Sequence, residues 1–350
     1  MSIRSMTGFA QVKSHAGDGN SFTLSLKSVN HRFLDPQLRL PLEMEELEMK
    51  IRRVLKERLA RGHVEVTLNL ERRPGQGFEW PESNHGITPD SKGNLWIGGN
   101  GANDGHILKF TRDGKFVKQF GFAYASAGSN DMWAFNKVAK ISLDESANEA
   151  YVADGYGNHR VAVIDMDTGK IKRYWGAYAN KPDDTNLGRY NPTAPPAQQF
   201  RNPVHCAVPS NDGLVYVCDR PNDRIQVFTK DGKFQKEAIV AKTTLGDGSV
   251  WDIAFSRDPQ QKYFYLADGA NEKVRVFDRQ SLTELTTFGD GGRYPGAFYA
   301  VHSIATDSKG NIYTTETYEG KRVQRFVYKG LAPVTKKDQG VVWPTKTTSH

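Results

Sequence analysis

The sequence has few cysteines and no Cys-x-x-Cys pair. Cys206 and Cys218 are the only two cysteines in 350 residues, which excludes a framework of several disulfides. Both fall on segments that read as the first two strands of one repeat. We therefore expect them to be buried free thiols.

Long apolar runs are also missing. No run approaches the length that a membrane span needs, and the first residues, MSIRSMTGFAQVKSHAGDGN, lack the apolar core of a secretory signal. As written, the chain is expected in the cytoplasm and not in a membrane. A strong charge of one sign is absent as well. The net charge of +7 permits an anionic partner without requiring one, because basic and acidic residues are interspersed.

The first part of the chain has the pattern of a small α+β domain. Residues 22–29 and 63–71 alternate apolar and polar residues, as strands do, and residues 42–60 place apolar side chains on one helical face. We predict a domain over residues 1–73 and a linker over 74–80. Five arginines could contact RNA phosphates or simply form the solvated face of the helix: Arg32, Arg52, Arg53, Arg58 and Arg61.

The rest of the chain is repetitive. Five units follow one another, and each reads as four short strands separated by polar turns. The units span residues 85–121, 139–176, 205–240, 251–289 and 302–330. Such a period, about 40 to 50 residues, predicts a mainly β fold, a β-propeller in which each unit is one blade. We place the propeller at residues 81–332 and a C-terminal tail at 333–350, with one long inter-blade loop at 177–200.

A histidine opens three of the five units. The equivalent positions hold His85, Ala139, His205, Trp251 and His302. Since the first strands of propeller blades line the central channel, these side chains should converge on one axis. Three imidazoles with a fourth direction open are the ligand set of a catalytic zinc site. The alternative is that the histidines are polar channel lining bridged by water.

Both parts of the chain resemble known families. The segments IRSMTGFA, KSVNHRFLD, LRLP and RGHVEVTL are similar in order and spacing to the N-terminal domain of the YicC-like endoribonuclease family. The segments VADGYGNHRV, VHCAV, CDRPNDRIQVF and VHSIA resemble NHL-repeat propellers, in particular the bacterial relatives of peptidyl-α-hydroxyglycine α-amidating lyase. That propeller family has six blades, of which five are visible here.

The second resemblance implies a chemistry. It implies zinc held by His85, His205 and His302, a catalytic base at Tyr156, and a carboxylate anchor at Arg220. Together they would cleave the C–N bond of a carbinolamide and release an amide and glyoxylate. The family's calcium-binding aspartate is Ser303 here, so a calcium site is not expected. A further substrate-binding arginine of the family lies on a blade that this chain replaces with the YicC-like segment.

Other functions remain open from the sequence. The propeller could be a non-catalytic module that binds a peptide-like or small-molecule ligand on its axis, or a protein partner. The YicC-like domain could bind RNA. The nuclease residues of that family lie largely in a domain not found here. We therefore expect no nuclease activity from residues 1–75. Propellers of this family are often exported, whereas YicC-like proteins are cytoplasmic, which raises the question of whether the fusion is a genuine gene product. With five blades, we expect an open or gapped ring with unpaired strand edges that invite association, partly covered by the tail from Gly340 onward.

Overall fold

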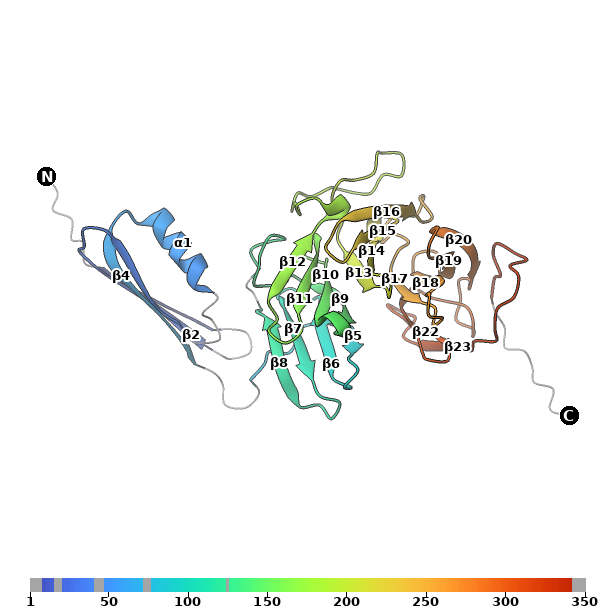
Figure 1. The fold of residues 1–350 in the computed structure, drawn as a ribbon, viewed down its shortest axis with the longest axis horizontal. Coiled ribbons are helices and arrows are strands. Elements are labelled where there is room, and N and C mark those ends of the chain that lie inside the picture. The colour runs from blue at the N-terminus through green and yellow to red at the C-terminus, as the bar shows by residue number, and fades with distance from the viewer. Residues whose placement is uncertain (1–7, 16–20, 41–46, 72–76, 124–125, 342–350) are drawn as a thin grey trace. The chain divides into compact units, whose positions relative to one another are not determined.

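A computed structural model describes residues 8–15, 21–40, 47–71, 77–123 and 126–341. The chain divides into two compact units, Met1–Trp80 and Pro81–His350. Each unit has its own sheets and its own hydrophobic core (Figure 1). No helix in the described part of the chain is long and apolar enough to cross a membrane.

The N-terminal unit is a four-stranded sheet with one helix. The strand order is β1-β2-β4-β3, and only the β3–β4 pair is parallel. The elements are β1 (Gly8–His15), β2 (Ser21–Val29), β3 (Leu34–Arg39), α1 (Glu48–Arg58) and β4 (Gly62–Glu71). The parallel β3–β4 pair is joined through α1, as a crossover connection requires. The predicted α+β domain is therefore confirmed.

Helix α1 packs on this sheet through its apolar face. Leu55 is buried with Val64 and Val66 of β4, and Ile51 and Leu59 pack against the same cluster. The predicted helix began at residue 42. The structure starts it at Glu48, and residues 41–46 lie outside the described part.

The arginines of the helix are engaged by neighbouring acids. Arg52 Nε lies 2.7 Å from Glu48 Oε1, and Arg53 Nε lies 3.9 Å from Glu57 Oε1. Such exposed pairs one helical turn apart are typical of a solvated helix face. They leave less positive charge available for an RNA phosphate.

The second unit contains five antiparallel sheets, one for each predicted repeat. The first blade has β5 (Asn84–Pro89), β6 (Leu95–Gly99), β7 (His106–Phe110) and β8 (Phe116–Gly121). The second has β9 (Val138–Asp144), β10 (Glu149–Asp154), β11 (Arg160–Asp165) and β12 (Ile171–Trp175). The third has β13 (Val204–Pro209), β14 (Leu214–Asp219), β15 (Arg224–Thr229) and β16 (Phe234–Ile239). The fourth has β17 (Asp252–Phe255), β18 (Tyr263–Asp268), β19 (Lys273–Asp278) and β20 (Thr283–Phe288), and the fifth has β21 (Val301–Thr306), β22 (Ile312–Glu316) and β23 (Val323–Phe326).

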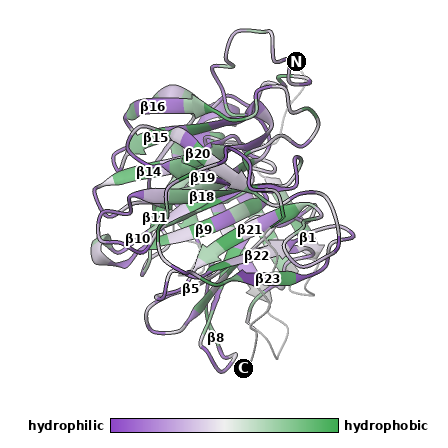
Figure 2. Ribbon diagram, turned by 90° about the vertical axis from the view of Figure 1, so that its right-hand side faces the viewer, coloured by the Kyte–Doolittle hydropathy of each residue, from purple (hydrophilic) through white to green (hydrophobic). Residues whose placement is uncertain are grey.

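The first strands of successive blades lie side by side. β5 neighbours β9, β9 neighbours β13, β13 neighbours β17, and β17 neighbours β21. In Figure 2 the blade strands carry both hydrophobic and hydrophilic segments along their length, as expected for sheets stacked face to face. The propeller prediction is confirmed by this arrangement.

The blades are held by hydrophobic cores between adjacent sheets. In the described part of the second unit there are four such clusters, one at each junction from the first blade to the fifth. A closed ring of five blades would need a fifth junction. The blades thus form an open arc, with the unfilled side between the fifth and first blades.

The described part of the C-terminal tail does not cover an end of this arc. The amide of Thr287 in β20 donates to Lys337 O, that of Gln339 donates to Thr287 O, and Lys273 Nζ lies 2.8 Å from Asp338. The tail therefore runs along the outer edge of the fourth blade. Of the segment from Gly340 onward, which we expected at the exposed edges, Gly340 accepts the amide of Gly289 beside the fourth blade, and residues 342–350 lie outside the described part.

The expectation of free thiols is wrong. Cys206 and Cys218 form a disulfide with a Cα–Cα distance of 4.8 Å. They are directly opposite on the antiparallel strands β13 and β14, which brings their Cβ atoms within bonding reach. Both are fully buried in the core between the third and fourth blades. A disulfide is typical of proteins folded in oxidising compartments, unlike the cytoplasm expected from the N-terminal sequence.

An acid–arginine pair recurs in four blades. The acid ends the second strand, and the arginine lies at or near the start of the third. The pairs are Asp154–Arg160 at 2.8 Å, Asp219–Arg224 at 2.7 Å, Asp268–Arg275 at 2.7 Å and Glu316–Arg322 at 2.6 Å. All four acids are buried, so each carboxylate is compensated by its guanidinium.

One ion pair crosses the channel. Lys140, on β9 in the second blade, places Nζ 2.5 Å from Oδ1 of Asp252, on β17 in the fourth blade. Asp252 is 2% exposed, and its other oxygen accepts the amide of Ile304 in the fifth blade at 3.1 Å. The ion pair and the hydrogen bond to Ile304 together connect the second, fourth and fifth blades. Among the described residues, no hydrophobic core joins the two ends of this arc.

We predict that Lys140→Met destabilises the propeller by about 2–4 kcal/mol, because Asp252 would keep a buried charge without its partner. Chemical denaturation followed by circular dichroism measures this. The matched control is Lys230→Met, since Lys230 pairs with Asp144 between adjacent blades and is 32% exposed. The control should cost less than about 1 kcal/mol. Equal losses in the two variants would show that the cross-channel pair has no special role.

Another buried acid, Asp223, has no ion-pair partner among the described residues. Asp223 is fully buried, its Oδ1 accepts the amide of Ser249 at 2.8 Å, and its Oδ2 has no hydrogen-bond partner among the described residues. Burial, with a contribution from nearby Asp268, raises the pKa of Asp223 to about 7. The folded protein therefore retains a proton here that the unfolded chain loses near its ordinary carboxyl pKa.

From this we predict a specific pH dependence. Between about pH 4 and pH 7 the free energy of unfolding should fall as pH rises, because the folded state binds more protons than the unfolded state. Asp223→Asn removes this contribution. Thermal unfolding should show that the variant gains more Tm relative to wild type at pH 8 than at pH 5. A pH-independent difference would contradict the raised pKa.

Candidate metal centre

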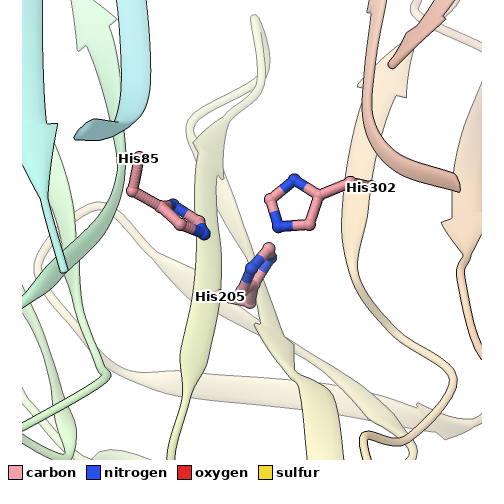
Figure 3. Close-up of side chains that lie close together, drawn as sticks. All are labelled: His85, His205 and His302. Carbon is pink, nitrogen blue, oxygen red and sulfur yellow. The ribbon is translucent and has the colours of Figure 1, made fainter. Parts of the chain in front are cut away.

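The three histidines of the repeat meet at the channel axis. His85 lies on β5, His205 on β13 and His302 on β21, the first strands of the first, third and fifth blades. One ring nitrogen from each lies within 4.8 Å of the other two, and Figure 3 shows the rings turned toward a common centre. The ring centroids are 4.8 to 5.1 Å apart.

Two of the rings are oriented by the blades that have no histidine at this position of the repeat. His85 Nδ1 lies 2.7 Å from the carbonyl oxygen of Ala139, and His205 Nδ1 contacts that of Trp251. Since a carbonyl can only accept, each Nδ1 carries the proton and each Nε2 presents a lone pair. Ala139 and Trp251 thus contribute through the backbone at the very positions where the other blades contribute imidazole.

The third ring is oriented differently. His302 is in the fifth blade, and the described chain has no further blade to supply a carbonyl. Its Nδ1 instead lies 3.0 Å from Oγ of Ser303, the next residue. A serine side chain therefore replaces the backbone contact that the other two rings have.

Tyr156 and Arg220 join the same group. Tyr156 follows β10, and its Oη lies 3.1 Å from Nε2 of both His85 and His205. A phenol has one proton and can donate to only one of these nitrogens at a time. Tyr156 therefore leaves the Nε2 of either His85 or His205 without its proton at any moment. A bound cation would interact favourably with the free lone pair.

The dimensions suit a metal ion. Zinc bonds to nitrogen of about 2.0–2.1 Å, in tetrahedral geometry, put ligand nitrogens about 3.3 Å apart. In the structure the three ligand nitrogens lie within 4.8 Å of one another. For all three to bind one zinc ion, each ring would have to move toward the common centre by about an ångström or less. The residues present therefore fit a three-nitrogen site for a metal such as zinc.

Burial keeps the imidazoles neutral. It lowers the pKa of His302 to about 3 and lowers the pKa of His205 and His85 as well, with Arg220 acting in the same direction. Neutral imidazole is the form that binds metals. Burial raises the pKa of Tyr156, and the positive charge of Arg220 opposes that shift.

Arg220 is held mainly by aromatic contact. Its guanidinium carbon lies 4.5 Å from the centre of the Trp251 ring, and the residue is 6% exposed. Nη1 donates to Tyr156 Oη and Nη2 to Asp247, both at the long distance of 3.3 Å. Nε has no hydrogen-bond partner among the described residues. This buried cation retains donors for an anionic ligand.

Five residues of this group were predicted from the sequence: His85, His205, His302, Tyr156 and Arg220. The contact of Ser303 with His302, the Lys140–Asp252 pair and Asp247 next to Arg220 were not. The sequence contained a signal for the Lys140–Asp252 ion pair, because these two residues directly follow the equivalent positions Ala139 and Trp251 of the repeat. Backbone carbonyls leave no such signal.

Comparisons with known proteins agree with the two-part organisation. Residues 3–83 match the family described as "Endoribonuclease YicC-like, N-terminal region". Peptidyl-glycine alpha-amidating monooxygenase B of Xenopus laevis is 29% identical over 156 residues, covering 44% of this chain and 16% of that protein. The A form is 27% identical over 154 residues, with 44% and 15% covered. The chain thus spans about a sixth of the length of these curated relatives. Both resemblances stated from the sequence are supported, the second as a weak similarity.

Solved structures give more distant matches. Virginiamycin B lyase from Staphylococcus aureus has a TM-score of 0.43 and 17% identity, with 71% of each chain covered. A putative 6-phosphogluconolactonase from Bacteroides uniformis has a TM-score of 0.46 and 15% identity, with 69% and 66% covered. At these scores the propeller assignment stands on the five sheets themselves.

We predict that Ser303→Ala lowers the affinity of the three-histidine group for added zinc by about 10- to 100-fold, the usual effect of removing a hydrogen bond that orients a ligand. Competition with a chromophoric chelator measures the affinity. Ser303→Thr keeps a hydroxyl and should retain most of it. If alanine and threonine behave alike, the hydroxyl does not orient His302.

Proposed function

We propose that the propeller is a zinc-dependent carbon–nitrogen lyase acting on peptidyl-α-hydroxyglycine or a closely similar carbinolamide. The observation that carries the proposal is the convergence of three neutral imidazoles with Tyr156 and Arg220 in one hydrogen-bonded group. The partial similarity to the amidating monooxygenases supports the substrate class.

In this proposal His85, His205 and His302 hold the metal. Zinc bound there supplies Lewis acidity, polarising the substrate hydroxyl and lowering its pKa. The burial of the site excludes water, which strengthens the electrostatic interactions within it. Calcium is not part of the proposal, because Ser303 offers a single hydroxyl where a calcium site needs several oxygen ligands.

Arg220 binds the substrate carboxylate. A guanidinium can bind a carboxylate through two parallel N–H donors, and Arg220 has donors that are unused or weakly used. Its position against Trp251 and Tyr156 fixes the carboxylate next to the histidines. The substrate is thus oriented with its hydroxyl toward the imidazole group.

Tyr156 receives the hydroxyl proton. As phenolate, its Oη takes the proton from the carbinolamide oxygen; the C–O bond becomes the carbonyl of glyoxylate as the C–N bond breaks. The departing nitrogen takes this proton back from the Tyr156 hydroxyl and leaves as the amide, so Tyr156 returns to its starting form. Burial raises the pKa of Tyr156 and so favours the phenol, and the positive charge of Arg220 opposes that shift toward the phenolate that this step requires.

Purified full-length protein should contain about one zinc ion per chain and release glyoxylate from a synthetic peptidyl-α-hydroxyglycine. His205→Ala should lose both the metal and the activity, with an unchanged β-sheet spectrum. Tyr156→Phe should keep zinc and lower kcat by about 100-fold or more, since it lacks the proton acceptor. His31→Ala, in the N-terminal unit, is the matched control and should change neither property.

The outcomes separate the alternatives. Wild-type protein without zinc, or His205→Ala with full zinc content, would show that the histidines are channel lining. Zinc without cleavage would favour the second candidate, a propeller that binds its ligand without reaction; the family arginine absent from this chain is the specific reason to consider it. RNA binding through residues 1–80 is a third candidate, supported by the YicC-like match alone.

A further inference from the structure

A cavity of about 760 Å³ includes Arg220 in its lining. Residues of the segment 184–190, in the long loop between the second and third blades, also line it. Arg220 also contacts Tyr156 at the histidines. A ligand bound at Arg220 therefore has the cavity directly beside it.

Hydrogen bonds to the blades fix the cavity wall. Asp184 accepts the amide of Ser129 at 3.0 Å, and Tyr190 Oη donates to the carbonyl of Lys242 at 3.0 Å. Arg201 donates to the carbonyl of Gly188. The loop is thus tied at three points to chain that lies outside it, and the cavity is a built feature of the fold.

The lining has more cations than available anions. The charged lining residues are Arg189, Arg201, Arg220, Asp184 and Asp247. Asp184 is engaged by Ser129 through both amide and hydroxyl, and Asp247 by Arg220 and Tyr318. Among the described residues, Arg189 and Arg201 have no carboxylate partner.

Arg201 is placed to act together with Arg220. Its Nε donates to Asn222 Oδ1 at 2.9 Å, and Asn222 lies in the same short turn as Arg220, η4 (Arg220–Asn222). Arg201 is half-buried, and desolvation lowers its pKa, an effect that the charge of Asp219 opposes. Arg201 is therefore hydrogen-bonded to the same turn that carries Arg220, and Arg220 in turn contacts Tyr156 beside the histidines.

We propose, on the basis of the lyase function above, that Arg201 and Arg189 form a subsite for an acidic side chain of the peptide. Arg220 takes the carboxylate of the terminal residue, and the neighbouring acid of the chain reaches Arg201. The preferred substrates are then peptides with Asp or Glu just before the α-hydroxyglycine. Charge pairing within a partly buried cavity gives this selectivity.

Binding can be tested without catalysis. The probes are two acetylated peptides that end in glycine, a stable analogue of the substrate, and differ only in Asp or Asn before it. Isothermal titration calorimetry should show the Asp peptide binding about tenfold more tightly to wild type, the effect of one charge-assisted contact. Arg201→Gln should reduce the ratio to about twofold or less, and exposed Arg189→Gln should reduce it in part.

Arg112→Gln is the matched control, because Arg112 is an exposed arginine on a turn of the first blade and does not line the cavity. It should keep the tenfold ratio. Equal binding of the two peptides by wild type, an unchanged ratio in both cavity variants, or no binding of either peptide would overturn the subsite.

Failure of the lyase proposal would look different. Charge-selective binding without glyoxylate release would leave the subsite in place as a ligand site and remove the catalytic function. Glyoxylate release at equal kcat/KM from matched Asp and Asn substrates would leave the lyase in place and remove the subsite.

Discussion

The buried acid–arginine pair is the interaction on which the propeller's functional face depends. In the second, third and fifth blades the guanidinium binds its acid through Nε and uses its other N–H groups to hold the chain between blades. Arg160 donates to the carbonyls of Ser129, Asp131 and Ala134, Arg224 to that of Gln199, and Arg322 to those of Gly292, Arg293 and Ala297. Each pair therefore fixes two parts of the chain: the turn between the second and third strands, and the connection that precedes the blade. Through Arg224 and Gln199, the long loop 177–200 is held in this way.

The histidine group shows a second regularity of the repeat. At the same position of the repeat, odd-numbered blades supply an imidazole, and even-numbered blades supply the carbonyl that orients the preceding imidazole. The position that appears inert in the sequence, Ala139, is therefore as necessary to the geometry as His85. Any residue could provide that carbonyl, which explains why alanine and tryptophan both occur there.

Much of the architecture could be predicted because it is periodic. The repeat of strands and turns predicted five sheets, and the channel position of each first strand brought three distant histidines to one point. What failed depended on register and long-range contacts. Cys206 and Cys218 read as separate thiols until the pairing of β13 with β14 placed them opposite each other. The roles of Lys140 and Arg201 likewise depend on residues far away in sequence.

The unfilled side of the arc has a consequence for how such a centre tolerates change. If imidazoles and carbonyls alternate around the axis, a blade between the fifth and the first would place a carbonyl, and not an imidazole, at this position of the repeat. All three imidazoles are present without such a blade, and the hydroxyl of Ser303 contacts His302 where a carbonyl contacts each of the other two rings. Removal of either adjacent repeat would instead delete a ligand outright. The site is therefore robust to deletion at alternate positions of the ring and fragile at the others.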